Sequence, residues 1–369
     1  MIWRRMLTAT LLATLAACSA DRPKPTALET YAPKIGGKAV WSASVGSVGF
    51  PLIVTARDGV FFVAGGDGDV QALQADSGAV LWRASAGAKL SAGVGSDGRY
   101  TSVVTRGNEV VTFDSGREIW RKRVPSAVVT PPLVAGERVF VMGVDRAVHA
   151  FDALDGRRLW SYQKPGEALT LAQAGVVTAF RNTLLVGQSQ RLTALDPTQG
   201  SVQWEVPMAS PRGTNEVERL ADLLGPAVRF GDRVCVRAFQ AAVACADVSR
   251  GAVLWTRTVG GLNAVGGDAD FVFGADASDR ITAWNVASGD VAWTNEKLLY
   301  RGLSGAVVVG TSVVFGDAEG YVHFLSTSTG EQQLRLPSDG KAVVGTPVLS
   351  GTTLLVTTQS GGLFAFRAN

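Results

Sequence analysis

The sequence predicts an all-β fold, an eight-bladed β-propeller with four-stranded antiparallel blades over residues 36–369. The main observation is a motif of Gly followed four residues later by Trp, which recurs at steps of 38 to 51 residues, the length of one blade. A high Gly content (43 of 369 residues) and only 18% charged residues favour short strands joined by tight turns. The motif tryptophans are Trp41, Trp82, Trp120, Trp160, Trp204, Trp255 and Trp293, with Leu334 in an eighth, degenerate slot.

Each period contains the same order of strands, and residues 128–160 show it clearly. Residues 128–134, 139–141 and 147–151 are predicted strands, and another begins at residue 157. Turn residues such as Asp155 and Gly156 separate them. In the outermost strand of a blade, each motif Trp can pack between adjacent blades and bury a large apolar area.

The two ends of the repeat complement each other. The first motif copy, Gly37 to Trp41, has no blade of its own before it, and the last copy, residues 343–366, contains three strands without an outer one. We therefore expect the N-terminal strand to complete the last blade and close the ring, which removes an open inter-blade surface. A seven-bladed ring is the alternative.

The first residues of the chain have the pattern of a secretory signal. Arg4 and Arg5 precede the apolar residues 7–17, a stretch too short to span a membrane, and Cys18 follows them in a context that looks like a bacterial lipobox. We expect a signal peptide at residues 1–17 and a lipidated, flexible tether at residues 18–35. Ser19 after the cysteine favours the periplasmic face of the outer membrane as the anchored location. The alternative is an ordinary signal peptide in which Cys18 is incidental.

The two longest steps of the repeat, 44 and 51 residues, are adjacent and predict a binding surface. They place extra residues near 164–171 and 207–224, in connections that emerge on one face of the disc. Apolar residues among charges suit a protein partner. Alternatively, the leucines only cover the edge of the disc. The candidate partner-binding residues are Leu169, Thr170, Leu171, Glu218, Arg219, Leu220 and Asp222.

Cys235 and Cys245 lie on consecutive strands of one predicted hairpin, in a compartment where a disulfide can persist. A two-residue turn at Gln240 and Ala241 would put the sulfurs on opposite faces. A three-residue turn centred on Gln240 would set the cysteines directly across from each other. Two buried thiols are the alternative, because Cys245 occupies the slot that alanine fills in other blades.

The family resemblance comes from residues 194–200 (ALDPTQG) and 151–160, which resemble the PQQ-like repeat of quinoprotein dehydrogenases. With the lipobox-like start, the chain as a whole resembles the BamB family, the lipoprotein subunits of the machinery that assembles outer-membrane β-barrels. The most specific stretches are residues 213–222 and 316–324, the latter preceded by 298–301. The resemblance implies docking on the POTRA domains of BamA, the rest of the Bam complex as partners, and contact with nascent outer-membrane proteins.

The family's partner-binding positions match this chain in part. Leu169 and Leu171 match the partner-binding leucines, and Asp222 matches an acidic position. Ala172 stands where the family commonly has a basic residue, and Leu224 replaces a second acid. The resemblance therefore implies that the apolar part of the interface is retained and part of its charge is lost.

The sequence favours a non-catalytic scaffold without catalytic residues, cofactor, metal or nucleic-acid partner. The net charge is only +3 and the chain has only two histidines. A quinone-dependent dehydrogenase would need a catalytic base and several Ca²⁺ ligands. The recurring acids Asp152, Asp196 and Asp247 are instead predicted to be turn residues. A scaffold lipoprotein of another envelope complex is the second alternative.

Overall fold

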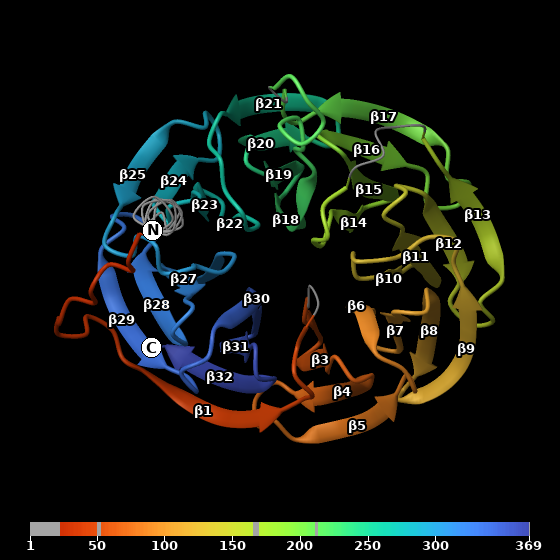
Figure 1. Cartoon of the computed structure of the whole chain (residues 1–369), viewed down its shortest axis with the longest axis horizontal. Helices are drawn as coiled ribbons and strands as arrows, with labels where there is room; N and C mark the ends of the chain where they lie inside the picture. Colours follow the sequence, from red (N-terminus) through yellow and green to blue (C-terminus); the bar gives the residue numbers. More distant parts are fainter. Residues whose placement is uncertain (1–22, 50–52, 165–169, 211–212, 369) are drawn as a thin grey trace, which may run out of the picture.

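The computed structural model describes residues 23–49, 53–164, 170–210 and 213–368. Within them, eight antiparallel sheets of four strands each form a ring around a central axis (Figure 1). The predicted eight-bladed propeller is confirmed. None of the described residues forms a helix with the length and hydropathy of a membrane span.

Each blade runs from an innermost strand near the axis to an outermost strand at the rim (Figure 1). The first four blades are β2 (Thr55–Arg57), β3 (Val60–Ala64), β4 (Asp69–Gln74) and β5 (Val80–Ser85); β6 (Leu90–Ser96), β7 (Tyr100–Thr105), β8 (Glu109–Asp114) and β9 (Arg117–Arg123); β10 (Leu133–Ala135), β11 (Arg138–Met142), β12 (Val148–Asp152) and β13 (Arg158–Tyr162); β14 (Val177–Phe180), β15 (Thr183–Gln188), β16 (Arg191–Leu195) and β17 (Val202–Pro207). The next three are β18 (Leu223–Phe230), β19 (Arg233–Ala238), β20 (Ala242–Asp247) and β21 (Ala252–Arg257); β22 (Gly266–Gly267), β23 (Phe271–Ala275), β24 (Ile281–Asn285) and β25 (Val291–Asn295); β26 (Val307–Val309), β27 (Ser312–Gly316), β28 (Tyr321–Ser326) and β29 (Gln332–Pro337).

The eighth blade closes the ring with strands from both ends of the chain. It contains β30 (Val343–Ser350), β31 (Thr353–Thr358), β32 (Gly362–Ala368) and, at the rim, β1 (Gly37–Ser44). β1 pairs antiparallel with β32, from Gly37 opposite Ala368 to Ser44 opposite Gly362. This is the closure expected from the sequence, and the count of eight sheets excludes the seven-bladed alternative.

The Gly–Trp motif is the contact between neighbouring blades. A Cβ atom at Gly78 would lie 2.6 Å from the Trp41 ring, and one at Gly156 would lie 2.6 Å from the Trp120 ring. Both glycines have positive φ (71° and 70°), which other residues rarely adopt. The indole N–H of Trp41 also donates to the carbonyl of Ala75 in the same turn, at 2.8 Å. The motif therefore recurs because the glycine turn of a blade receives the Trp ring of the blade before it, except at Gly37, where Leu334 takes the place of the ring.

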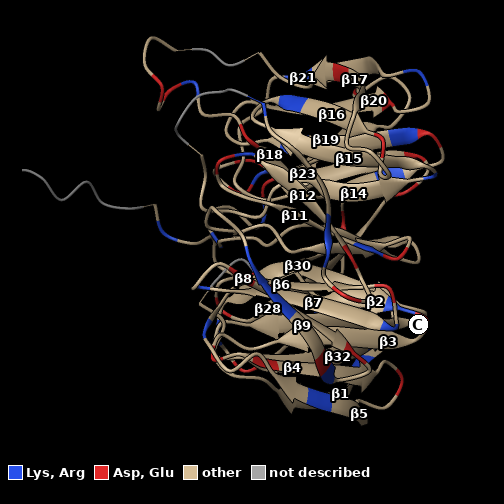
Figure 2. Ribbon diagram, turned by 90° about the vertical axis from the view of Figure 1, so that its right-hand side faces the viewer, with Lys and Arg blue, Asp and Glu red and all other residues tan. Residues whose placement is uncertain are grey.

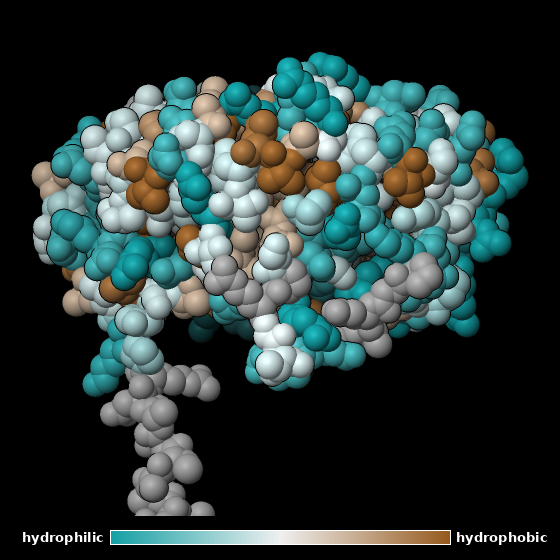
Figure 3. Space-filling view, turned by 90° about the horizontal axis from the view of Figure 1, so that it is seen from above, coloured by the Kyte–Doolittle hydropathy of each residue, from teal (hydrophilic) through white to brown (hydrophobic). Residues whose placement is uncertain are grey.

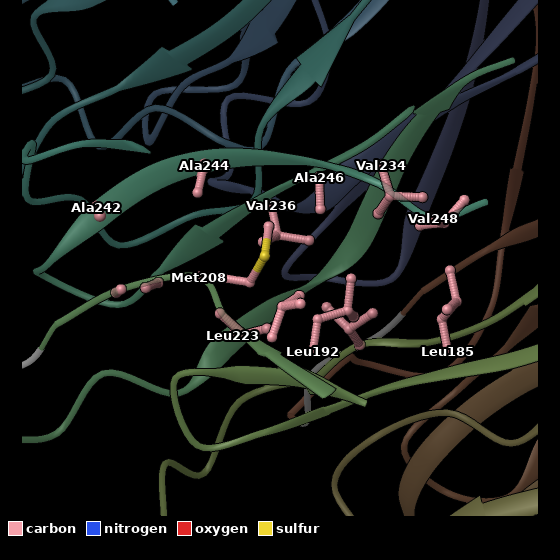
Figure 4. Close-up of a cluster of buried hydrophobic side chains, with 14 of the residues drawn as sticks. Leu185, Leu192, Met208, Leu223, Val234, Val236, Ala242, Ala244, Ala246 and Val248 are labelled. Atoms are coloured by element: carbon pink, nitrogen blue, oxygen red, sulfur yellow. The ribbon is translucent and has the colours of Figure 1, made fainter. Parts of the chain in front are cut away.

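The hydrophobic core is divided in the same way. The described residues form eight buried clusters, and each cluster is shared by two neighbouring blades. The cluster between the β14–β17 and β18–β21 blades contains Met208 and Leu223, whose side chains lie among those of Leu192 and Val236 (Figure 4). Hydrophobic burial therefore stabilises the ring through the interfaces between blades.

The rim carries separate exposed hydrophobic residues. Val80, Leu81, Val202, Leu254 and Val291 on outer strands are more than two-fifths exposed. Figure 3, which looks onto the side of the disc that carries β17 and β21, shows small hydrophobic areas among hydrophilic ones. Single exposed apolar residues of this kind are ordinary on protein surfaces.

The segment before β1 differs from the predicted flexible tether of residues 18–35. Thr26 N donates to Leu299 O at 2.9 Å, and Lys34 N donates to Gln333 O at 2.8 Å. Leu28 packs against the core cluster shared by the β22–β25 and β26–β29 blades. Residues 26–35 thus lie along the outside of β29 (Figure 1), because apolar and charged side chains of this segment find partners there. Cys18 and the predicted signal peptide lie outside the described residues.

Candidate docking surface

The candidate surface lies on one face of the disc. Strands alternate in direction, so the connections between blades share a face with the turns between the second and third strands of each blade. The two long connections are residues 163–176, between β13 and β14, and residues 208–222, between β17 and β18. Their ends meet, because Gly175 forms a β-bridge with Leu224 and Gly225 N donates to Ala174 O at 2.9 Å. The two connections are therefore joined directly.

Asp222 connects the loops of this surface through polar contacts, and we call it their joint. Its Oδ2 accepts a hydrogen bond from Leu171 N at 2.8 Å, which connects the two loops. Its Oδ1 lies 3.6 Å from Nη2 of Arg146, in the turn between β11 and β12. The side chains of Asp222 and Arg146 are only 17% and 9% exposed. The carboxylate of Asp222 thus faces the protein's own loops.

Arg146 is a site residue that sequence reasoning missed. It is 8% exposed and has φ of 63°, and its carbonyl accepts a hydrogen bond from Gln188 Nε2 at 2.8 Å. It therefore links the β10–β13 blade to the next blade and to Asp222. In the sequence Arg146 is one turn residue among many, and no local pattern distinguishes it.

The connection of residues 208–222 has a buried base and an exposed tip. Met208 and Ala221 are 0% and 3% exposed and belong to the cluster in Figure 4. At the tip, Glu218 Oε2 accepts from Thr214 N at 2.8 Å, and Asn215 Oδ1 accepts from Glu218 N at 2.9 Å. The Thr214 hydrogen bond lowers the pKa of Glu218. These bonds order the tip within a loop that the core holds at both ends.

Val217 is the apolar residue that the tip presents to solvent. It is 71% exposed and has Glu216 and Glu218 as neighbours. An apolar residue within a charged segment was a usable signal, but the candidate set did not include it. An exposed apolar residue flanked by charges has the composition of a protein-binding surface.

The remaining predicted residues occupy different places on this face. Thr170 and Leu171 are partly buried, and with Arg146 and Asp222 they line a hollow of about 40 Å³. Arg219 and Leu220 are partly buried, and Glu218 is exposed. Leu169 lies outside the described residues. The structure therefore brings Leu171 and Asp222 into direct contact and places residues 218–220 on the adjoining loop.

A larger hollow of about 220 Å³ adjoins this one. Gln173, Ala174 and Leu224 line both hollows, and Leu262 and Asn263, from the connection between β21 and β22, also line the larger one. Leu262 is 41% exposed. The concave part of the face therefore extends beyond the two loops.

The two cysteines lie behind this face in the β18–β21 blade. Ala238 pairs with Ala242, so the turn has three residues, centred on Gln240 with φ of 51°. Cys235 is directly opposite Cys245, and the sulfurs form a disulfide. This is the register in which a bridge between the two cysteines is feasible.

The recurring acids serve the turns. Backbone N–H groups of Leu154, Thr198 and Ser249 donate to Asp152, Asp196 and Asp247 at 2.9, 2.7 and 3.0 Å. Hydrogen bonds from the Thr198 and Ser249 hydroxyls lower the pKa values of Asp196 and Asp247. In the described part of the chain, no group of three or more His, Cys, Asp or Glu residues is arranged to hold a metal ion.

Known proteins are similar to this chain in sequence and in architecture. A family model described as "Outer membrane protein assembly factor BamB" matches residues 31–90 and 66–295. The protein of that name from Bordetella pertussis (strain Tohama I) is 37% identical over 378 residues, which cover 100% of this chain and 97% of that protein. The crystal structure of BamB from Moraxella catarrhalis has a TM-score of 0.81 at 22% identity and covers 90% of this chain and 100% of that one.

An enzyme shares the fold. Quinohemoprotein alcohol dehydrogenase from Comamonas testosteroni has a TM-score of 0.68 at 14% identity and covers 90% of this chain and 76% of that one. At this identity the likeness shows the fold alone. The full-length sequence match and the family model decide the assignment, and they confirm the resemblance found in the sequence. The chain belongs to the family of the outer membrane protein assembly factor BamB.

Proposed function

We propose that this protein is a non-catalytic docking subunit that assists the assembly of β-barrel proteins into the outer membrane. Family membership supports the process, since the relatives are outer membrane protein assembly factors. The observation that carries the docking role is the pair of adjoining connections, residues 163–176 and 208–222, which interrupt the repeat and share Asp222 as their joint. The partner is the POTRA region of BamA, within the Bam complex.

The chemistry of the two loops supports a protein partner. Val217 supplies an exposed apolar contact, and Leu171 supplies a partly buried one beside a hollow. Glu216 and Glu218 flank the apolar tip with negative charge. Protein interfaces commonly combine a small apolar centre with a charged rim. Nascent barrel proteins are a further partner class in the same process.

The proposed location is the periplasmic face of the outer membrane, with lipids on Cys18. The names of the relatives support association with the outer membrane. The anchor is tested by Cys18→Ser in the full-length protein, which is expected to lose labelling by radioactive palmitate and to leave the membrane fraction. Palmitate labelling that persists in this variant would contradict the anchor site.

The docking surface is tested by Leu169→Asp combined with Leu171→Asp. A buried charge in an apolar contact is costly, so recovery of BamA with the tagged protein from solubilised outer membranes should fall at least about tenfold. The melting temperature should stay within a few degrees. Leu154→Asp, an equally drastic change at a 65% exposed leucine on the opposite face, is the matched control and should recover BamA normally.

Three outcomes would contradict parts of this proposal. An unchanged yield of BamA with the double variant would remove this loop from the interface, and recovery of other envelope proteins without BamA would support a scaffold of another complex. Dye-linked oxidation of alcohols or sugars after addition of Ca²⁺ and pyrroloquinoline quinone would contradict the non-catalytic role.

A further inference from the structure

A second site on the same face holds the chain's own N-terminal strap (residues 26–35). At its first residue, Thr26 N donates to Leu299 O at 2.9 Å and Thr26 O accepts from Arg301 Nη1 at 3.0 Å. Leu299 and Arg301 belong to the connection between β25 and β26, a connection of the same kind as the two docking loops. The strap thus begins on the docking face.

A buried polar network orients Arg301 toward the strap. Arg301 is 4% exposed, and its Nε donates to Asp317 Oδ2 at 2.8 Å. Its Nη2 donates to Glu319 at 2.5 Å. Asp317 is fully buried, and Nε2 of His323 lies 2.9 Å from its Oδ2. The guanidinium is therefore locked by charge-assisted bonds, and one N–H remains directed at the Thr26 carbonyl.

Further contacts hold the rest of the strap along the rim. Arg335 Nη1 donates to Glu29 O at 3.2 Å, and Cζ of the same side chain lies 5.6 Å from the centre of the Tyr31 ring. Lys297 pairs with Glu29 at 2.7 Å, and Lys34 pairs with Glu331 at 2.6 Å. Together with Leu28 in the core cluster, these contacts extend over the whole strap.

The residues that hold the strap, which we call the strap dock, include sequence features that the docking surface leaves unexplained. Residues 298–301 and 316–324 are among the stretches most specific to the family resemblance, yet they lie on blades that the two docking loops do not belong to. In the structure they supply Leu299, Arg301, Asp317, Glu319 and His323, which hold or orient the strap.

We infer that this dock fixes where the membrane anchor joins the disc and turns the docking face toward the side from which the anchor comes. The inference rests on the proposed lipidation of Cys18. Thr26 follows Cys18 by eight residues, which span at most about 28 Å when fully extended. In the side view of Figure 2, the N-terminal end of the described chain and the connection after β17 leave the disc on the same side. Release of the strap would lengthen the segment between the anchor and the disc, and the disc would no longer have a fixed orientation relative to the membrane.

The orientation is tested with full-length lipidated protein in vesicles of phosphatidylethanolamine and phosphatidylglycerol that carry a headgroup-labelled acceptor lipid. A short-range donor fluorophore is attached at Val217→Cys on the docking face or at Leu154→Cys on the opposite face. Both residues are well exposed, at 71% and 65%. We expect energy transfer to be at least twofold greater from position 217. Equal transfer from both positions would overturn the inference.

A strap-released variant makes the test specific. Residues 26–34 are replaced by a Gly/Ser segment of equal length, and the difference between positions 217 and 154 should disappear. The same kind of replacement at residues 20–24, before the dock, is the matched control and should keep the difference. A difference that persists in the released variant would contradict the role of the strap. Flotation with the vesicles separates this result from a failure of the anchor, in which every variant stays unbound.

Hydrogen exchange tests the dock independently of membranes. The amides of Thr26 and Lys34 are expected to exchange slowly in the native protein. Arg301→Lys keeps a cation beside Asp317 but cannot reproduce the bidentate arrangement with the bond to Thr26 O, so exchange at Thr26 should accelerate at least tenfold. Fast exchange at Thr26 in the unaltered protein would overturn the dock.

Discussion

The rim of this propeller uses one contact that is repeated from blade to blade, whereas its docking face uses contacts that occur once. At the rim, one contact is repeated around the ring: an aromatic ring from one blade covers a glycine turn of the next, as Trp41 covers Gly78 and Trp120 covers Gly156. On the docking face, the decisive contacts occur once. Asp222 accepts a hydrogen bond from Leu171 N and forms an ion pair with Arg146, and no other blade repeats this arrangement within the described residues.

The difference separates stability from function. A repeated contact tolerates change at one copy, and Leu334 already replaces Trp in the slot that covers Gly37. A contact that occurs once has no substitute. We therefore expect substitutions at the rim to lower stability without changing partner affinity. Substitutions at Asp222 are expected to lower partner affinity without lowering stability.

The largest expected effect is at the rim. Trp120 is 7% exposed, and its indole N–H donates to Ala153 O at 2.8 Å. Trp120→Ala should lower the free energy of unfolding by about 3–5 kcal/mol, because a large buried ring leaves a cavity between two blades. Urea unfolding followed by circular dichroism measures it. If Trp120→Ala instead left the stability unchanged and weakened BamA binding, the proposed separation of stability from partner affinity would be wrong.

The disulfide is the next largest effect, because it adds covalent stability to the blade that follows the docking loop. Both cysteines are fully buried. Replacing Cys235 and Cys245 together with alanine should cost about 2–4 kcal/mol of unfolding free energy. Thiol titration of the unsubstituted protein, denatured but not reduced, should find no reactive thiol from this pair. Two titratable thiols would contradict the bridge.

Substitutions at Asp222 probe the docking face. Asp222→Ala removes the acceptor for Leu171 N–H, so the free protein no longer holds the two loops together. Restoring their arrangement on binding should cost about 1–3 kcal/mol, which weakens BamA affinity about 5- to 150-fold. Asp222→Asn keeps an oxygen acceptor and should retain most of the affinity, measured by calorimetry with purified POTRA domains. If Asn weakens binding as much as Ala, Asp222 acts as a charge toward the partner instead of a joint between the loops.

The smallest effect concerns the two buried histidines. Burial lowers the pKa of His323 and of His149 below 6.5. Below pH 6.5 the unfolded chain therefore binds more protons than the folded one. As the pH is lowered, the free energy of unfolding should decrease by up to about 1.4 kcal/mol per pH unit for each histidine. His323→Gln and His149→Gln should each flatten this dependence between pH 6.5 and 5, measured by urea unfolding. An unchanged slope in the double variant would contradict the assignment.

The same network keeps its carboxylate ionised through that pH range. Burial opposes the charge of Asp317, but the hydrogen bond to His323 and the pairing with Arg301 lower the pKa of this carboxyl below its usual value. The strap dock is therefore expected to remain intact between pH 5 and 6.5, and hydrogen exchange at Thr26 across this range checks it.

Much of the fold could be predicted because a propeller records its blade length in the sequence. The Trp spacing predicted the eight blades and the closure by β1, and the long steps located the two long connections on one face. The docking of the strap was not predictable from its one proline, Pro33, which indicates an extended chain but not its partners. Leu299, Arg301 and Gln333, which hold it, lie some 270 to 300 residues away in the chain.

The sequence by itself determined the periodic part of this protein: the blades, their order and the points where the repeat is interrupted. Each of these depends on local turns and on one contact that every blade repeats. Only the tertiary structure decided that Asp222 joins two loops with Arg146, that the cysteines share a register, and that residues 26–35 are docked. These contacts occur once and join distant residues, so no periodic pattern records them.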